Sequence, residues 1–277
     1  MIDLHCHSTA SDGLLKPADV VDAARAAGLA TIALTDHDTT AGLPQAMAAG
    51  EAVGVRVVAG CEFSVAAPWG EMHLLAYFLP VADATLEAFL IEARSARDRR
   101  AHAMISKLAG LGLAITFDDV AHEAGGGAVG RPHVARALRR LGHVNSVQQA
   151  FDRYIGRGRP AYVDKELPTL RTVADLVHAR GGIVSAAHLK YQGTLANLTR
   201  LKGDGLDAVE TRHPSHSGDM VATITEAALV LDLGRTGGSD WHGETDPIGT
   251  HAQLGSQQVP DEWLVALEAR RPALDRV

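Results

Sequence analysis

The sequence predicts an α/β barrel that is interrupted by a helical insertion. About seven short apolar runs alternate with helical patterns, which indicates a parallel sheet with helical crossovers that closes, or nearly closes, on itself. The alternation stops between residues 81 and 164, where one helical pattern follows another. We therefore expect a barrel domain formed by residues 1–80 and 165–277 and a helical insertion at 81–164. The alternative is that weak strands are hidden in this segment.

Length and composition are those of an ordinary globular protein. The chain has 277 residues and a formal net charge of −7, with 46% hydrophobic and 21% charged residues. This balance is too apolar for a disordered chain. At this length we expect about one or two domains whose core needs no disulfides. Cys6 and Cys61 alone cannot form a disulfide framework, and we interpret both as small buried packing residues.

No segment points to a membrane. No apolar run reaches the roughly 18–20 residues of a membrane-spanning helix. The first residues, MIDLHCHSTASDG, have neither the basic nor the apolar region of a signal peptide. We therefore expect a cytoplasmic protein with no membrane partner. The acidic net charge argues against binding to duplex DNA, but it is compatible with a small anionic substrate at a locally positive site.

Strand and helix signals can be placed along the chain. The expected strands are residues 2–4, 31–34, 55–59, 73–78, 183–187, 207–210 and 230–235. The expected barrel helices include residues 18–27, 39–52 and 170–179, and those of the insertion are 84–110, 117–124, 132–141 and 146–154. Pro17 stands at a first-turn position of the first helix, and Thr169 is the expected N-cap of the third.

Histidine is unusually frequent, with 14 in the chain, and many lie in short clusters with acids. In a strand, residues i and i+2 face the same side, so His5 and His7 point together while Cys6 faces away. A neutral imidazole is the commonest transition-metal ligand, and two on one face make half of a metal site. Taken alone, this pair is equally compatible with two polar residues at a strand end.

The position of further histidines and acids decides between these interpretations. The pairs Asp36/His37 and Asp240/His242, together with Glu62 and His188, all come just after an expected strand. Such ends share one face of an α/β barrel, where these barrels place their active sites. Mixed carboxylates and imidazoles suit hydrolytic sites for hard-to-borderline cations better than a Cys-rich structural zinc site. The sequence therefore predicts a metal centre at this face.

The motifs that carry these residues together resemble one known family. They are DLHCHS, Asp12-Gly13, LTDHD, GCE, the isolated His73, GRPH and GSDWHG, and they occur in the order found in the polymerase and histidinol phosphatase (PHP) family. The resemblance extends from Asp3 to His242. It implies a distorted (β/α)7 TIM-like barrel that holds two or three divalent metals. The segments GRPHVARAL and IGRGRPAYV resemble a branch that acts on nucleoside 3′,5′-bisphosphates and on short RNA from its 5′ end.

The resemblance also implies a set of metal ligands. The first metal would be held by His5, His7, Glu62 and Asp240, the second by Glu62, His73 and His133, and the third by Asp12, His37 and His242. Some relatives have a histidine where this chain has Asp12, so the third site has an oxygen ligand in place of a nitrogen. Mn²⁺ is the expected ion, with Zn²⁺, Fe²⁺ and Mg²⁺ as alternatives. Asp3 and Asp36 are interpreted as partners that orient imidazoles.

The implied activity is removal of the 3′-phosphate from nucleoside 3′,5′-bisphosphates such as adenosine 3′,5′-bisphosphate, with 5′→3′ exoribonuclease activity on short RNA as a second activity. A hydroxide that bridges the metals is the expected nucleophile. Three cations add about +6 and their three acids about −3, so a phosphate would meet a positive pocket. His188 or His213 is the candidate general acid, although either is also compatible with a plain surface histidine.

Substrate contacts are expected from basic residues in and just after the insertion, and from His188. Arg131 is the candidate for holding the reacting phosphate. Arg157, Arg159 and Lys165 form a compact cationic loop that suits a second phosphate, and Tyr162, like Tyr154, suits stacking on a base. The plain alternatives are a solvated basic loop and a tyrosine packed between helices. The basic run at residues 94–100 is interpreted as a solvated helix face.

Two other functions compete with this one. A histidinol-phosphate phosphatase is the alternative enzyme, and the cationic loop, which suits a second phosphate, argues against it. A non-catalytic, metal-stabilised accessory module is the alternative of another class. The full set of candidate ligands argues against that interpretation.

Overall fold

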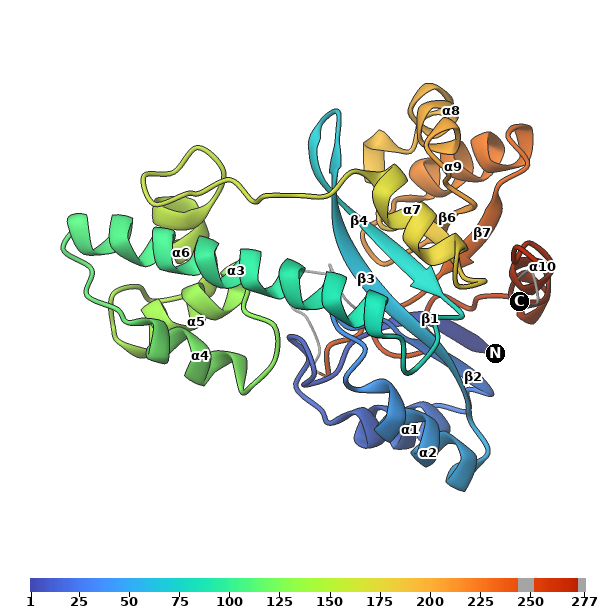
Figure 1. Ribbon diagram of the computed structural model, residues 1–277, viewed down its shortest axis with the longest axis horizontal. Helices are drawn as coiled ribbons and strands as arrows, with labels where there is room; N and C mark the ends of the chain where they lie inside the picture. Colours follow the sequence, from blue (N-terminus) through green and yellow to red (C-terminus); the bar gives the residue numbers. More distant parts are fainter. Residues whose placement is uncertain (244–251, 274–277) are drawn as a thin grey trace.

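The fold is a nearly closed barrel of seven strands, which we describe from a computed structural model over residues 1–243 and 252–273. The strands follow one another around the sheet in sequence order (Figure 1). They are β1 (Ile2–Cys6), β2 (Thr31–Leu34), β3 (Arg56–Ala67), β4 (Gly70–Tyr77), β5 (Ile183–Ala186), β6 (Ala208–Arg212) and β7 (Gly234–Gly237). The predicted number of strands and the barrel architecture are confirmed.

One strand departs from the parallel pattern. β4 pairs antiparallel with both β3 and β5, whereas the pairs β1–β2, β2–β3, β5–β6 and β6–β7 are parallel. The barrel closes where β1 meets the chain after β7, through a parallel bridge between Cys6 and Trp241. The hydroxyl of Tyr77 donates across the interior to the carbonyl oxygen of Leu4, 2.9 Å away. The interior is therefore filled with side chains and is not a channel.

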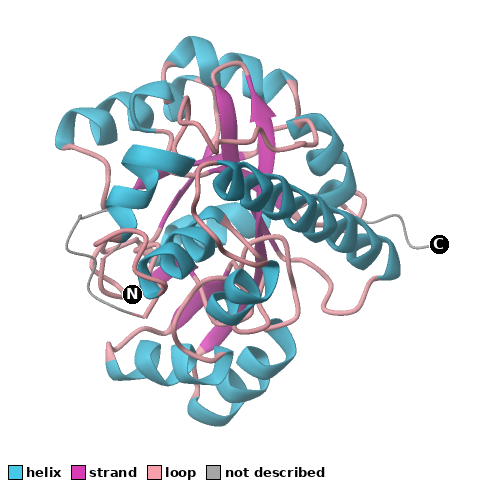
Figure 2. Ribbon diagram, turned by 90° about the vertical axis from the view of Figure 1, so that its left-hand side faces the viewer, coloured by secondary structure: helices cyan, strands magenta, loops and turns pink. Residues whose placement is uncertain are grey.

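Helices cover the outside of the barrel, as the view from the insertion side shows (Figure 2). Side-chain caps start several of them: Thr169 accepts a hydrogen bond from the amide of Thr172, and Pro17 occupies the first turn of its helix as predicted. The covering helices are α1 (Pro17–Ala26), α2 (Leu43–Val53), α7 (Leu170–His178), α8 (Leu195–Gly203), α9 (Gly218–Val230) and α10 (Asp261–Ala269).

Between β4 and β5 the chain leaves the barrel and forms a second body of helices, which extends to the left in Figure 1. These elements are α3 (Ala84–Gly110), α4 (Phe117–Ala124), α5 (Arg131–Arg140), α6 (Val147–Ala150) and a π-helical turn, η1 (Phe151–Ile155). They enclose a hydrophobic core of their own, centred on side chains such as Met104, Leu108 and Leu138. The predicted helices of residues 84–110 and 117–124 are confirmed to the residue.

Two strand predictions are wrong in their extent. β3 runs on to Ala67 and returns through a hairpin as β4, so Glu62 lies inside a strand and not after its end. The sequence pattern missed this because the apolar run is broken by Gly60 and Glu62. The strand expected at residues 230–235 belongs partly to α9, and β7 begins at Gly234. Of its apolar residues, Val230 ends α9 with an exposed side chain, and Leu233 is buried in the connection between α9 and β7.

The basic run at residues 94–100 is not a solvated helix face. Arg94 donates to the carbonyl oxygen of Asp38, and Arg97 donates to the side chain of that aspartate. The side chain of Arg97 is only 11% exposed. This part of α3 therefore packs against the loop that follows β2, next to His37. No helix in the described ranges 1–243 and 252–273 has the length and apolarity that a membrane span requires.

Candidate metal centre

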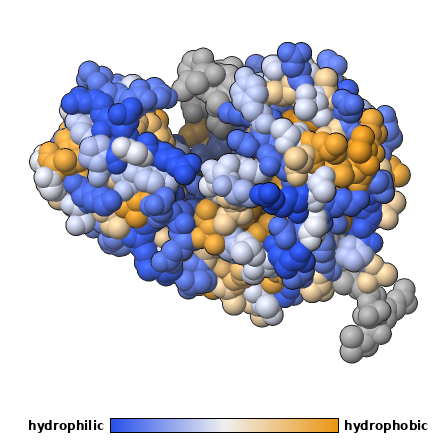
Figure 3. Space-filling view, turned by 90° about the horizontal axis from the view of Figure 1, so that it is seen from above, coloured by the Kyte–Doolittle hydropathy of each residue, from blue (hydrophilic) through white to orange (hydrophobic). Residues whose placement is uncertain are grey.

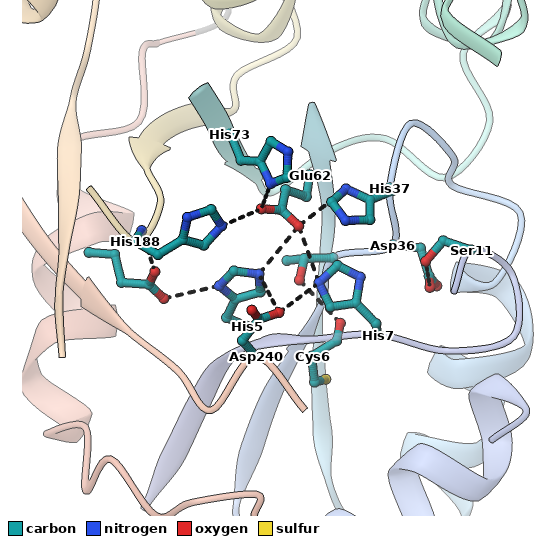
Figure 4. Close-up of polar contacts among 12 residues, drawn as sticks. His5, Cys6, His7, Ser11, Asp36, His37, Glu62, His73, His188 and Asp240 are labelled. Carbon is teal, nitrogen blue, oxygen red and sulfur yellow. Dashed lines mark hydrogen bonds and ion pairs between the residues drawn. The ribbon is translucent and has the colours of Figure 1, made fainter. Parts of the chain in front are cut away.

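Imidazoles and carboxylates from all seven strands or the loops after them meet at one mouth of the barrel (Figure 4). The donors that could share a cation form five overlapping groups whose ligand atoms lie within 4.8 Å of one another. These groups are His5–His7–Asp240, His5–Glu210–His213, His7–His37–Glu62, His7–Asp12–His242 and Glu62–His73–His188.

Glu62 lies at the centre of this arrangement and is 1% exposed. Its Oε1 is 2.9 Å from Nδ1 of His73 and 3.1 Å from Nε2 of His188. Its Oε2 is 3.2 Å from Nε2 of His7 and 3.3 Å from Nδ1 of His37. Burial opposes ionisation, but the surrounding imidazoles outweigh it and hold the pKa of Glu62 well below its usual range. Its two oxygens face two different sets of imidazoles, as a bridging carboxylate requires.

Two further acids face imidazoles on either side of His7. Asp240 Oδ1 lies 3.3 Å from Nε2 of His5 and 3.2 Å from Nε2 of His7. Asp12 Oδ1 lies 3.3 Å from Nε2 of His242, while its Oδ2 is 3.9 Å from Nε2 of His37. Burial again opposes ionisation, and the neighbouring imidazoles hold the pKa of Asp12 well below its usual range. The structure therefore brings the acids and histidines from opposite ends of the chain together.

The donor set fits divalent cations. Donors about 2.0–2.2 Å from a common ion lie roughly 3–3.5 Å from one another, as most of these atoms do. Both ring nitrogens of His7 and Nδ1 of His37 are buried, and within the described ranges the carboxylate oxygens near them do not lie in a hydrogen-bonding direction. Burial lowers the pKa of His37 to about 3, so its imidazole is neutral. A bound cation would be the partner that these buried nitrogen lone pairs lack, and it would offset the charge of the buried carboxylates beside them.

Two glycines allow the close backbone approach on which the centre depends. A side chain at Gly238 would lie 2.4 Å from Cβ of His5, and one at Gly13 would lie 2.8 Å from the carbonyl of His7. The loop after β7 and the turn after Asp12 can therefore press directly against β1.

Asp3 and Asp36 have a different role from the one expected of them. Asp3 accepts hydrogen bonds from the backbone amides of His5, Ser239 and Gly255, and Asp36 accepts from Ser8 and Ser11. Within the described part of the chain they contact no imidazole ring. The prediction that they orient imidazoles directly is wrong, because each carboxylate is turned toward the backbone or hydroxyls of the loops that carry the ligands.

His133 lies apart from the donor groups found among the described residues. Its ring is buried at the start of α5, where Nδ1 accepts a hydrogen bond from the amide of Gly130. Burial, together with the nearby Arg136, lowers its pKa to about 4. His188 occupies the place on Glu62 that was expected for His133. His213 lies next to His188, and its Nε2 is 3.4 Å from Oδ2 of Asp240.

Glu210 is a functional candidate that sequence reasoning missed. It is fully buried in β6, where Oε1 lies 3.0 Å from Nδ1 of His5 and Oε2 accepts from the amide of His188 at 2.8 Å. A proton on Nδ1 of His5 leaves the lone pair of Nε2 facing the acids, ready for a cation. The signal in the sequence was a carboxylate directly after the apolar Ala208 and Val209 of a short expected strand.

Replacing Glu210 by alanine is expected to weaken metal binding by about 10–100-fold, since His5 loses its orienting partner and the backbone of His188, at φ +33°, loses its anchor. Glutamine retains an acceptor and should have a smaller effect. Metal affinity is measured by calorimetric titration of the metal-stripped protein, with Glu226→Ala, an exposed change on α9, as the control. Unchanged affinity in Glu210→Ala would show that Glu210 does not orient these ligands.

A cavity of about 170 Å³ opens from the donors into the insertion. Arg97, Arg100 and Arg131 line it together with apolar side chains such as Met104 and Phe151. Nη2 of Arg100 is buried without a hydrogen-bond partner within the described ranges. Three guanidinium groups, one of them incompletely paired, make this cavity suitable for an anion.

The residues of the expected cationic loop are divided between the outer surface and the neighbourhood of this cavity. Arg157 is exposed and donates to the carbonyl oxygen of Trp69, Arg159 is exposed, and neither lines the cavities beside the donors. Lys165 is 5% exposed and lies 3.4 Å from Glu71, which in turn lies 3.8 Å from Arg131. Tyr162 packs beneath the guanidinium groups of Arg100 and Arg131.

Similarity to known proteins extends over most of the chain. A model of the PHP domain matches residues 3–122. A 5′-3′ exoribonuclease of Haemophilus influenzae is 35% identical over 245 residues, which cover 87% of this chain and 89% of that protein. A 3′,5′-nucleoside bisphosphate phosphatase of Chromobacterium violaceum is 34% identical over 249 residues, which cover 87% of each chain.

The fold is also similar to that of a solved phosphoesterase. A solved structure from Bifidobacterium adolescentis, of a protein assigned to the metal-dependent phosphoesterases, matches with a TM-score of 0.87 and 30% identity, covering 99% of this chain and 97% of that one. The names of these relatives share one chemistry, the hydrolysis of phosphoric esters. With this similarity added to the ordered motifs and the convergent donors, the chain belongs to the PHP family of metal-dependent phosphoesterases and is a phosphoric-ester hydrolase.

Proposed function

We propose that the protein hydrolyses the 3′-phosphate of nucleoside 3′,5′-bisphosphates and, by the same chemistry, the first phosphodiester bond of short 5′-phosphorylated RNA. One observation carries this proposal: the cluster of metal donors opens directly into a small cavity lined by three arginines. A substrate with a reacting phosphate and a second phosphate nearby matches these two neighbouring sites. The names of the relatives from H. influenzae and C. violaceum support both forms of the substrate.

The candidate ligands are reassigned from their geometry. We propose that His5, His7, Glu62 and Asp240 hold one cation, that Glu62, His73 and His188 hold a second, and that Asp12, His37 and His242 hold a third. When bound, divalent cations, with Mn²⁺ as our proposal, activate a water molecule and neutralise charge on the phosphate. His133 then serves to fix the start of α5, which carries Arg131.

The residues of the chain complete the reaction. Arg131 lies at the junction of the cavity and the donors and holds the reacting phosphate, while Arg97 and Arg100 bind the 5′-phosphate. The bond between phosphorus and O3′ breaks, and the leaving oxygen takes up a proton. His213 is the proposed proton donor, because His188 is occupied at Glu62 and His213 lies beside the donors, with its Nε2 3.4 Å from Oδ2 of Asp240.

The loop residues have supporting roles in this proposal. Lys165 holds Glu71 and thereby Arg131, and Tyr162 supports the two guanidinium groups above it. Arg157 and Arg159 stay at the outer surface. We propose that residues 81–164 act as a cap over the site and that the protein works in the cytoplasm.

The test is a comparison of phosphate release from adenosine 3′,5′-bisphosphate, adenosine 3′-monophosphate and histidinol phosphate in the presence of Mn²⁺. The bisphosphate should have the highest kcat/KM, exceeding the monophosphate by at least about tenfold, since only the bisphosphate offers a 5′-phosphate to charge-assisted hydrogen bonds from the arginines. A preference for histidinol phosphate would replace the proposal with that activity. No release from any ester would favour an accessory module.

A further inference from the structure

We propose that Arg136, Arg139 and Lys190 form a groove that binds the phosphodiester chain of RNA on the 3′ side of the bond that is cut. The inference rests on the proposed function and adds residues that select an oligonucleotide over a nucleoside bisphosphate. We call these three residues and the cavity walls that carry them the outer groove.

The two cavities that adjoin the metal donors differ in volume. The arginine-lined cavity toward α3 has a volume of about 170 Å³, whereas the cavity on the other side of the donors has about 690 Å³. A bisphosphate with its 5′-phosphate at Arg97 and Arg100 and its reacting phosphate between Arg131 and the donors leaves the larger space unused. In RNA bound the same way, the reacting phosphate continues through O5′ into the next nucleotide, which must enter the larger space.

The charges on the walls of this cavity suit a phosphodiester chain. Arg136 and Arg139 are three residues apart on α5 and so lie on the same side of the helix. Lys190, in the turn that follows His188, lines the cavity from the barrel side. None of the three forms a salt bridge within the described ranges of the chain. Among the residues that the structure describes, the acids that line this cavity are the proposed metal ligands Asp12, Glu62 and Asp240.

The neighbouring Arg140 differs from Arg136 and Arg139 because its charge is paired with acids of the insertion. It lies next to Arg139 on α5, but its guanidinium donates to Asp119 and Glu123, both at 2.8 Å. Its charge is therefore compensated within the insertion, whereas those of Arg136 and Arg139 are available to a ligand. Arg140 thus offers a matched control on the same helix.

The surroundings favour a single strand. The cavity lies between α5 of the insertion and the loops of the barrel, and the surface view shows a notch between the smaller and the larger lobe (Figure 3). Phe151 lines the cavity, and Tyr191, which is 80% exposed, follows the cavity-lining Lys190 in the chain without lining the cavity itself. Aromatic faces beside unpaired cations are the usual combination for unpaired nucleotides, whose bases stack and whose phosphates bind arginine and lysine.

The test compares two substrates in the same variants. KM is measured for adenosine 3′,5′-bisphosphate and for a 5′-phosphorylated trinucleotide RNA with Arg136→Gln/Arg139→Gln, with Lys190→Gln and with Arg140→Gln. The double variant should raise KM for the trinucleotide by about tenfold and leave KM for the bisphosphate within about twofold, and Lys190→Gln should change it in the same direction by less. Arg140→Gln should change neither. The salt dependence of trinucleotide kcat/KM should also become shallower, by a slope of about 0.7 for each phosphate that the variant no longer binds.

Equal effects on both substrates, or none on the trinucleotide, would overturn the outer groove. If the wild-type protein turns over neither substrate, the proposed function fails, and the inference is judged by binding alone. Fluorescence anisotropy of a 3′-labelled, 5′-phosphorylated pentanucleotide then has to show weaker binding in the double variant than in Arg140→Gln. Equal affinities in these two variants would reject the groove independently of catalysis.

Discussion

Replacing Glu62 by glutamine is expected to lower kcat by more than about 100-fold, since even partners that only orient metal ligands typically contribute 10–100-fold. The two oxygens of Glu62 face separate sets of imidazoles, so the change disturbs two proposed cation sites at once. Glutamine keeps the shape of the side chain and removes its charge. Steady-state turnover of adenosine 3′,5′-bisphosphate, together with the metal content of the purified variant, measures the effect.

The matched control is Glu226→Gln, the same substitution at an exposed position of α9, which should leave turnover unchanged. Circular dichroism of Glu62→Gln has to show a folded protein, so that a fall in activity reports on the site. Near-native turnover with full metal content would mean that Glu62 does not bridge two cations.

Removing the metals is expected to abolish turnover and to destabilise the fold. The centre holds Glu62, Asp12 and Asp240 close together in a buried place, so the cations that offset their charges also stabilise the native state. A single site saturated at about 100 times its Kd contributes roughly 2.7 kcal/mol. For a protein of this size that corresponds to a fall in Tm of at least about 5 °C on chelation.

The measurement is activity and thermal unfolding before chelation, after chelation, and after adding back Mn²⁺. Both turnover and Tm should return with the metal. Full activity in protein shown by elemental analysis to be free of metal would contradict the account, as would a Tm that is indifferent to chelation.

The convergence of the metal donors could be predicted from the sequence because it follows from strand ends. His37 and His188 come just after short apolar runs, and in a barrel those ends share one mouth. Asp240 follows β7, whose residues GRTG form no apolar run. Glu62 reaches the same mouth by another route. It lies within β3, opposite Leu75 of the antiparallel strand β4. The sequence pattern did not show that this strand continues past Glu62 into a hairpin.

Roles that depend on packing between the two bodies were not predictable. The spacing in RSARDRR is compatible with an exposed helix face, and only the docking of α3 on the loop at Asp38 turns Arg97 and Arg100 toward the site. The position of His133 is a similar case. Pro132 placed it correctly in the first turn of a helix, but the hydrogen bond from Gly130 to its ring depends on how that turn folds locally.

The most direct test of the central claim is the number of divalent cations bound per chain. The metal-stripped protein is loaded with Mn²⁺, freed of excess ion by gel filtration and analysed by mass spectrometry of its elements, in parallel with Glu62→Gln. The account predicts two or three manganese ions in the wild type and clearly fewer in the variant. A wild-type protein that retains none, or a variant that retains them all, would contradict it.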